Sequence, residues 1–491
     1  MTRLSNDTLQ HLPDVIEKPG YDRATVTVGI VHLGIGAFHR AHQAVFTDDV
    51  LARDPSWGIC GVSLRSPDTR DALAPQDGLY TLKVQDGDGE TLRIIGSVVE
   101  TLVAPEDPQA VLVRMADPAT RIVSLTVTEK GYCHNPATGM LDDNHPDVLH
   151  DLQNPGKPRS AIGFIVEALA QRQAAGVDAF TLLSCDNLPS NGHVLKRVVS
   201  RFAELRDPGL AAFVAGIASP STMIDRIVPA TTDADRAAIA VALGVQDAWP
   251  VVTEPFSQWV IEDRFAAGRP GWEEVGAELV TDVEPYEQMK LRLLNGSHSS
   301  LAYLGFLAGA ETVADAMALP GMQPLIEGLM HDEVSPTLPP LAGFDLAAYR
   351  DALIARFNNP SLRHRTWQIA MDGSQKLPQR LLATIRDRMR AGASYDRLVL
   401  GVAAWMSYAR GLDEAGKAID VRDPLAGRIA ALTQGLDDPE EIVAMFLSLT
   451  EVFADDLGRD ASFWAGLVDA LSRLLSKGAA AELAAWQRSN R

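Results

Sequence analysis

A short apolar run that ends in two closely spaced glycines constrains the fold of this chain most strongly. Residues 27–33 read Thr-Val-Gly-Ile-Val-His-Leu, which is typical of a buried strand, and Gly34 and Gly36 follow at once. Residues 37–51 then have the composition of a helix. A strand, a glycine turn and a helix open a dinucleotide-binding fold: the first glycine permits the tight turn, and the second lets a pyrophosphate approach the helix N-terminus.

This turn supplies the first candidate cofactor contacts. The third glycine of the dinucleotide fingerprint is missing, because His39 stands there, and Arg40 is a candidate to meet a phosphate. A plain structural turn is the alternative for so short a pattern. The contacts predicted at the turn are Gly34, Gly36, Ala37, Phe38 and Arg40.

The segment after the second expected strand, residues 58–64, bears on the choice of cofactor. Asp68 is placed to bind the ribose hydroxyls of NAD, whereas Arg65 could instead accommodate a 2′-phosphate. A surface turn is the alternative for Asp68. We predict NAD, with Arg65 and Asp68 among the cofactor contacts.

The remaining pattern divides the chain into two parts. Buried strands are expected at 121–127 and 179–184, and a β-hairpin at 80–84 and 91–95 interrupts the simple alternation. Asn187 follows the last of these strands, where ligands bind in open α/β sheets. We predict an α/β fold in which a Rossmann-type dinucleotide-binding domain with insertions, residues 1–285, precedes a mostly α-helical domain, residues 286–491. Residues 355–380 could pack back on the first domain. Helices are expected at 380–391, 395–409, 439–453, 461–475 and 479–487.

Residues 286–298 concentrate chemically useful side chains on one expected helix. At about 100° per residue, Lys290, Asn295 and His298 fall within an arc of roughly 140°. A lysine among leucines can lose solvation, which lowers its pKa towards that of a useful general base. The neighbouring amide can donate to an oxygen that becomes negative. An amphipathic helix with scattered polar residues is the alternative.

A second group of cations lies in residues 360–380. Arg363, His364, Arg365 and Lys376, followed by Arg380, stand out in a strongly acidic protein. Such a concentration suits recognition of a carboxylate by charge-assisted hydrogen bonds, although an ordinary solvated face has the same composition. We predict that the first four bind substrate.

Composition excludes several classes of function. Lys and Arg number 44 against 64 Asp and Glu, a net charge of −20, which argues against nucleic acid as a partner. Cys60, Cys133 and Cys185 have neither disulfide nor metal-ligand spacing, so reduced thiols are expected. No apolar run suits a signal peptide or a membrane span. We therefore expect a cytoplasmic protein, a monomer or small homo-oligomer, without a metal.

The sequence resembles the mannitol dehydrogenase family of polyol-specific long-chain dehydrogenases. The resemblance rests on residues 34–42, 126–132 and 184–187, and on Lys290 followed by Asn-Gly-Ser-His at 295–298. It implies a metal-independent reaction in which Lys290 is the general base, Asn187 and Asn295 hold the substrate oxygen, and His298 orients substrate and lysine. It further ties Glu287 and Glu129 to proton passage, and places Asp225 near the lysine.

Within the family, residues 361–381 resemble members that interconvert D-mannonate and D-fructuronate with NAD, so the expected partner is a small sugar acid or polyol. Oxidation of mannitol or arabinitol by the same site is the first alternative. Tyr286-x-x-x-Lys290 also fits the short-chain dehydrogenase dyad, although that dyad lies inside the dinucleotide fold. A zinc dehydrogenase lacks its ligand spacing here, and a non-catalytic NAD-binding sensor would not need the full Lys/Asn/Asn/His set.

Overall fold

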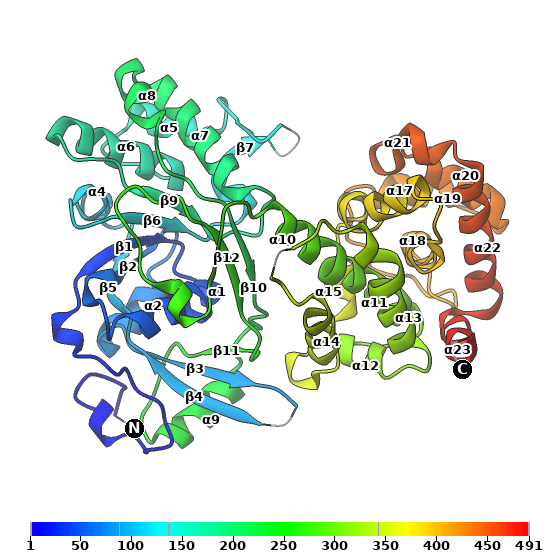
Figure 1. Ribbon diagram of the computed structural model, residues 1–491, viewed down its shortest axis with the longest axis horizontal. Helices are drawn as coiled ribbons and strands as arrows, with labels where there is room; N and C mark the ends of the chain where they lie inside the picture. The colour runs from blue at the N-terminus through cyan, green and yellow to red at the C-terminus, as the bar shows by residue number, and fades with distance from the viewer. Residues whose placement is uncertain (1, 88, 136–137, 342, 490–491) are drawn as a thin grey trace. The chain divides into compact units, whose positions relative to one another are not determined.

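The chain forms two compact units, Met1–Glu284 and Pro285–Arg491. The structure is a computed structural model that describes residues 2–87, 89–135, 138–341 and 343–489 (Figure 1). Among these residues, no helix is long and apolar enough to cross a membrane.

A parallel five-stranded sheet in the order β5-β2-β1-β6-β9 forms the centre of the first unit. Leu33, the last residue of β1, pairs with Val62 of β2 on one side and Leu125 of β6 on the other. The strand order therefore reverses at the carboxyl end of β1, where dinucleotide-binding sheets open their crevice. This confirms the predicted Rossmann-type fold, although no strand was expected where β5 lies. The strands are β1 Val28–Leu33, β2 Gly58–Ser63, β5 Val98–Val103, β6 Ile122–Leu125 and β9 Thr181–Ser184.

Helices cover both faces of this sheet (Figure 1). One core contains Val111 of α4, Phe164 of α6 and Val198 of α7, and the other contains Phe46 of α2. Because the sheet is buried on both faces, its strands are almost continuously apolar. The helices of this unit are α1 Ala37–Ala41, α2 Gln43–Val50, α3 Asp68–Leu73, α4 Pro108–Ala116, α5 Pro146–Gln153, α6 Ala161–Ala175, α7 Asn191–Arg206, α8 Pro208–Val214 and α9 Asp233–Leu243.

Two three-stranded sheets are the insertions, and a two-stranded sheet pairs β7 (His134–Asn135) with β8 (Met140–Leu141). The predicted hairpin is confirmed as β3 (Tyr80–Gln85) and β4 (Glu90–Ile95). Strand β11 (Val251–Thr253) pairs with β3 and extends the hairpin to three strands. Asp88, in the turn between β3 and β4, lies outside the described residues. The other three-stranded sheet has the order β10-β12-β13, with bounds Thr222–Asp225, Gln258–Glu262 and Glu278–Val280.

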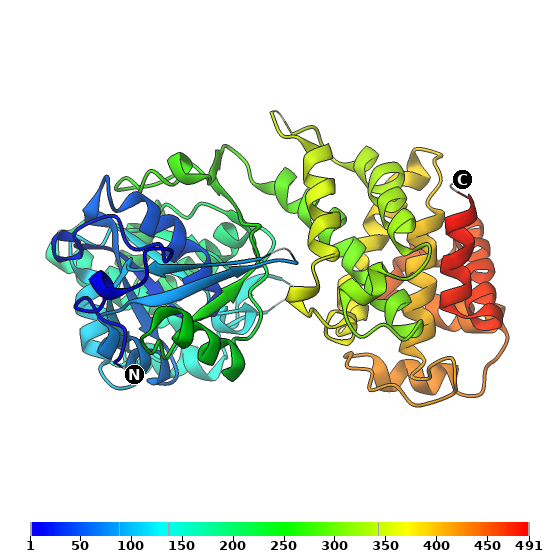
Figure 2. The ribbon, with the colours of Figure 1, turned by 90° about the horizontal axis from the view of Figure 1, so that it is seen from below.

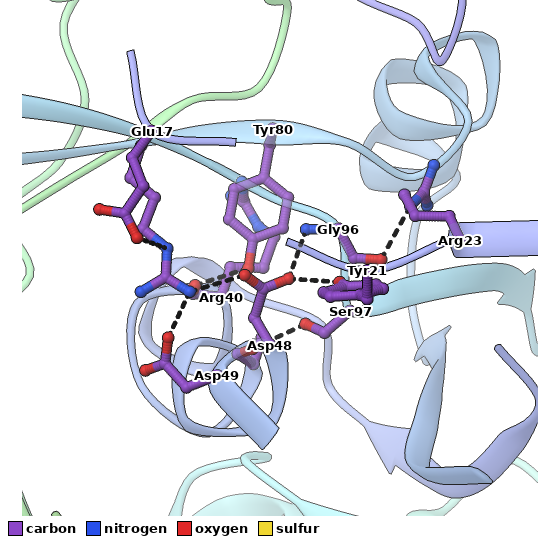
Figure 3. Close-up of polar contacts among 11 residues, drawn as sticks. Glu17, Tyr21, Arg23, Arg40, Asp48, Asp49, Tyr80, Gly96 and Ser97 are labelled. Carbon is purple, nitrogen blue, oxygen red and sulfur yellow. Dashed lines mark hydrogen bonds and ion pairs between the residues drawn. The ribbon is translucent and has the colours of Figure 1, made fainter. Parts of the chain in front are cut away.

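Asp48 is a buried residue of α2 that joins the β3–β4 hairpin to the helices that follow the glycine turn (Figure 3). Its carboxylate accepts from Tyr21 Oη at 2.5 Å, from the Gly96 N–H at 2.8 Å and from Arg93 Nη2 at 2.7 Å. A buried charge is tolerated only when it is paired and hydrogen-bonded in this way. The network therefore holds α2 against the end of β4.

The regular elements after Pro285 are all helices in the part of the chain that the structure describes (Figure 2). Helix α11 is buried along almost its whole length and packs against α12, α15 and α18. The predicted helix 439–453 is two helices, because the backbone of buried Leu449 leaves the helical region at φ −78°, ψ 81°. The helices are α10 Glu284–Met289, α11 Gly296–Leu307, α12 Val313–Met317, α13 Met322–Gly328, α14 Leu346–Phe357, α15 Thr366–Ala370, α16 Gly373–Leu377, α17 Ala383–Arg390, α18 Asp396–Ala409, α19 Ala426–Thr433, α20 Pro439–Leu447, α21 Thr450–Gly458, α22 Ala461–Lys477 and α23 Ala479–Ser489.

Candidate functional site

Gly34 is required by the backbone and by its neighbours. Its φ is +95°, and a Cβ there would lie 2.2 Å from the carbonyl oxygen of Thr126. The Thr126 hydroxyl also donates to the Gly34 carbonyl at 2.8 Å. The ends of β1 and β6 therefore meet at a contact that only glycine permits.

Gly36 is a glycine for a different reason. Its φ of −88° and ψ of −175° suit any residue, and a Cβ would meet nothing closer than the Gly34 carbonyl oxygen at 3.8 Å. The protein itself therefore leaves the space above exposed Gly36 open, at the point where α1 begins. That space fits the pyrophosphate of a dinucleotide, which must approach the backbone closely. Half-buried Ala37 and Phe38 follow at the start of the helix.

The structure does not support the prediction that Arg40 contacts a phosphate. The Arg40 side chain is buried, donates from Nη1 to the Trp249 carbonyl, and lies 5.2 Å from the centre of the Tyr80 ring. Tyr80 Oη in turn donates to the Arg40 carbonyl at 2.6 Å. Because the β3–β4 insertion packs on α1, this arginine joins the two elements instead of facing a ligand.

A pair of stacked histidines lies beneath the turn. The rings of His32 and His39 are 3.5 Å apart and nearly parallel, and His32 shares hydrogen bonds with Ser124 Oγ at 2.8 Å and Thr126 Oγ1 at 2.9 Å. Burial lowers the pKa of His32 to about 3 and that of His39 well below its ordinary value. His39 therefore fills the third glycine position as a neutral packing group.

Arg65 and Asp68 are both exposed in the segment that follows β2. Asp68 is the first residue of α3 and accepts from Ser66 Oγ at 2.9 Å. Since β2 neighbours β1, the two side chains lie at the edge of the sheet where the ribose of a dinucleotide is expected.

Asp186 is a positioning residue that the sequence did not single out. Its buried carboxylate accepts from the N–H groups of Val127 at 3.0 Å and Thr128 at 2.8 Å, and from Tyr132 Oη at 2.9 Å. It thereby ties the loop after β6, which carries exposed Glu129, to the end of β9, where exposed Asn187 follows. The signal available in the sequence was the acidic residue directly before the candidate amide Asn187. Asp225, another predicted residue, is buried at the end of β10.

In the second unit the predicted helix 286–298 contains a π-helical turn, Lys290–Asn295. The Gly296 N–H bonds to the Leu291 carbonyl, five residues back, where an α-helix would bond four back. A turn that pairs residue i with i+5 brings Lys290 and Asn295 onto the same side of the helix. The angle between these two side chains is therefore smaller than the roughly 140° expected for a regular α-helix. Lys290 is 8% exposed, Asn295 is half-buried, and half-buried Glu287 precedes them on α10.

His298 lies one turn further on and is buried among aromatic and cationic groups. Its ring centre is 4.8 Å from that of Phe357 and 5.4 Å from that of His364. Burial, together with the neighbours His364, Arg356 and Arg380, holds the pKa of His298 well below its ordinary value. The ring is therefore neutral, with one nitrogen that can donate and one that can accept.

The cationic group differs in membership from the prediction. Burial and the charges of Arg356 and Lys376 lower the pKa of His364, so its imidazole is neutral. Burial and the charge of Arg380 lower the pKa of Lys376, while Asp372 and Asp423 raise it. Arg380 Nη1 donates to Ser299 Oγ at 3.2 Å and to the Asn295 carbonyl at 3.4 Å. By contrast, two predicted members are exposed: Arg363 and Arg365.

Arg356 is the member that the sequence did not single out. It lies on the buried face of α14 with Tyr349, Leu353 and Phe357. The sequence signal was an arginine at the helical spacing of the apolar residues that form the buried face of α14. Because arginine is almost never buried without a partner, this position indicates a specific role for its charge.

Strand order, glycine turn and open helix start define a dinucleotide-binding protein with a helical second unit. Family models match both units: the mannitol dehydrogenase Rossmann domain over residues 28–274 and the mannitol dehydrogenase C-terminal domain over residues 282–475. The chain is an oxidoreductase of the mannitol dehydrogenase family.

Individual relatives cover nearly the whole chain. The D-mannonate oxidoreductase of Escherichia coli (strain K12) is 50% identical over 94% of this chain and 96% of its own. Among solved structures, the Pseudomonas fluorescens mannitol 2-dehydrogenase ternary complex with NAD and D-mannitol is 39% identical, with a TM-score of 0.84 and coverage of 99% and 100% of the two chains. A D-sorbitol dehydrogenase in substrate-free form is 35% identical, with a TM-score of 0.92 and coverage of 98% and 100%.

The two glycines of the turn predict opposite phenotypes. Gly34→Ala should destabilise the first unit by roughly 2–4 kcal/mol, because it combines an unfavourable φ with a backbone clash. Gly36→Ala should have the same free energy of unfolding as the wild type, but its affinity for the dinucleotide should fall at least about tenfold. Urea unfolding and NADH fluorescence titration measure the two effects. Unchanged NADH affinity in Gly36→Ala would contradict a cofactor role for that space.

The stacked histidines predict sensitivity to acid. Below about pH 6.5 the unfolded chain protonates His32 and His39, whereas the folded unit keeps them neutral, so the free energy of unfolding falls as the pH drops. The slope reaches about 1.4 kcal/mol per pH unit for each histidine. His39→Phe keeps the stack and removes one titration, so urea unfolding between about pH 7.5 and 5 should show a shallower slope. An unchanged slope would show that His39 is not held neutral.

Proposed function

We propose that the protein is an NAD-dependent oxidoreductase that interconverts D-mannonate and D-fructuronate. The observation that carries the proposal is the group of cations around His298, because a carboxylate distinguishes a sugar acid from a neutral polyol. The 50% identity to a D-mannonate oxidoreductase supports the same substrate class. The open space at Gly36 and the exposed acid Asp68 support NAD as the cofactor.

Lys290 is the proposed general acid and base. It is almost fully buried, and removing an amine from water favours the neutral form that can take a proton. During oxidation of the alcohol, the hydroxyl proton passes to Lys290 while the carbon loses a hydride; reduction returns both. Nicotinamide, when bound, supplies the acceptor or donor for that hydride.

The remaining residues hold the oxygen and the proton path in this proposal. Asn295 shares the side of the π turn with Lys290, so its amide can donate to the oxygen as charge develops. The resemblance to the family implies the same task for Asn187, and a path for the proton along Glu287 and Glu129. Neutral His298 can donate to a hydroxyl without repelling a protonated lysine. The resemblance to the family also implies that Asp225 acts near the lysine.

We assign the carboxylate to His364 and Lys376 and add Arg356 to them. The charges of Arg356 and Lys376 act on His364, and those of Arg356 and Arg380 act on His298, so the cations surround two neutral imidazoles that can donate hydrogen bonds. The charge-assisted hydrogen bonds that such cations offer are about twice as strong as neutral ones. Arg363 and Arg365 have a weaker part in the proposal, because they are exposed and water screens them.

The main alternative is oxidation of a polyol such as mannitol. The 39% identity to a mannitol 2-dehydrogenase over the full chain favours it. The same lysine, amides and histidine would serve, and the cations would then bind hydroxyl groups. A non-catalytic NAD sensor would bind NADH and show no turnover. The rival dyad with Tyr286 is disfavoured, because that tyrosine lies on α10 and outside the dinucleotide fold, against the ring of Phe344.

Lys290→Ala should lower kcat by about 10²- to 10⁴-fold while NADH binding is retained, because only the proton transfer is removed. Stopped-flow hydride transfer and NADH titration separate these two effects. Tyr286→Phe is the matched control and should keep most of the turnover. Near-normal turnover in Lys290→Ala would remove this residue as the base.

A panel of fructuronate, tagaturonate and fructose with NADH tests the substrate class. The wild type should prefer a keto acid, and Lys376→Met should raise the KM for that acid by about 10- to 100-fold with little change for fructose. Arg363→Gln, an exposed neighbour, is the control and should change KM little. Fructose as the preferred substrate of the wild type would establish the polyol alternative and leave the lysine mechanism intact.

A further inference from the structure

We infer that Cys133, His145 and Asp147 form a binding site for a zinc-like divalent metal ion in the first unit. One ligand atom from each of the three side chains lies within 4.8 Å of the other two. The spacing of the cysteines along the chain gave no sign of such a site, because its members come from two segments that only the fold brings together.

The geometry follows from the segment between η5 (Glu129–Tyr132) and α5, in which strands β7 and β8 pair. Cys133 comes directly after η5, His145 is the residue before the first turn of α5, and Asp147 lies in that turn. His145 Nδ1 is 4.0 Å from Asp147 Oδ2 and also accepts the Asp147 N–H at 3.2 Å. Metal–ligand bonds are about 2.0–2.3 Å long, so the three ligand atoms would draw closer than 4.8 Å to share one ion.

The surrounding charges favour a cation at this place. The charged groups that act on the Cys133 thiol are the carboxylates of Asp147, Asp151 and Asp142. Asp151 is occupied, because it accepts from Ser160 Oγ at 2.7 Å and from the Arg159 N–H at 2.8 Å. A divalent ion would offset the remaining negative field and take up the thiolate.

The donor set selects the kind of metal. A thiolate, an imidazole and a carboxylate together suit Zn²⁺ or Co²⁺, whereas Mg²⁺ and Ca²⁺ require oxygen ligands. Cys133 is almost fully buried, while the side chains of His145 and Asp147 are 32% and 46% exposed, which leaves an entry path and room for water as a fourth ligand. The ion would join Cys133 to the start of α5 and so hold the segment after β6. Its role is structural and does not depend on the substrate.

The test uses the full chain, stripped with a chelator and kept reduced, and titrated with Co²⁺. We expect about one Co²⁺ per chain and a thiolate-to-cobalt charge-transfer absorption that Zn²⁺ displaces. Zn²⁺ should also raise the Tm, because it binds only the folded state. Neither measurement depends on catalytic turnover. A negative result would therefore contradict the metal site and leave the proposed catalytic function untouched.

Matched variants decide the outcome. Cys133→Ser should abolish the charge-transfer band and weaken binding more than about 100-fold, whereas Cys60→Ser, which removes a thiol in β2, should keep both. His145→Asn retains a side-chain acceptor for the start of α5 while removing the imidazole, so it tests the site even if Cys133→Ser folds poorly. The absence of the band in the wild type, its persistence in His145→Asn and Cys133→Ser, or its loss in Cys60→Ser would overturn the proposal.

Discussion

The close approach of two backbone segments at Gly34 is the constraint on which the first unit depends. The carbonyl of Thr126 occupies the position that a side chain at residue 34 would take, and the Thr126 hydroxyl fixes the carbonyl of Gly34. This contact joins the ends of β1 and β6 at the point where the strand order reverses. It also sets the direction in which the chain leaves β1, so α1 begins beside open space at Gly36. Asp186 extends the same arrangement to β9 by binding two N–H groups of the loop after β6. The edge that receives a dinucleotide is thus built mainly from backbone positions.

A comparable constraint acts in the second unit through the π turn. Its register places the amine of Lys290 and the amide of Asn295 on one side of the helix, and neighbouring cations hold it in place. Arg292 donates to Asp387 at 2.7 Å and to Thr337 Oγ1 at 2.9 Å, while Arg380 donates to the Asn295 carbonyl. π turns are rare in proteins in general, although the described residues of this unit contain two more, Leu329–Val334 and Pro378–Leu382. The interactions of these arginines therefore contribute to the geometry that the proposed proton transfer needs.

The elements of the fold were largely predictable, because their signals are local. The apolar runs at β1, β2, β6 and β9, the hairpin at β3 and β4, and most C-terminal helices follow from periodicity and turn residues. Lys290, Asn295 and His298 could be placed on one helix, but the π turn could not, since the hydrogen-bond register leaves no trace in composition. The side chain of Arg40 depends on where a distant insertion packs. Arg356 and Asp186 matter through their neighbours, which are remote in sequence, and the same is true of Cys133 and His145.

The π turn has a consequence for how this segment can vary. In a regular α-helix of the same length, Lys290 and Asn295 would lie about 140° apart. An α-helix brings two side chains onto one face when they are four residues apart, which is one residue fewer than the π turn holds here. The number of residues between the amine and the amide is therefore tied to the hydrogen-bond register of the turn. A homologous sequence that lacks one residue at this place would keep the two side chains on one face in a plain α-helix, whereas one of equal length without the π turn would separate them.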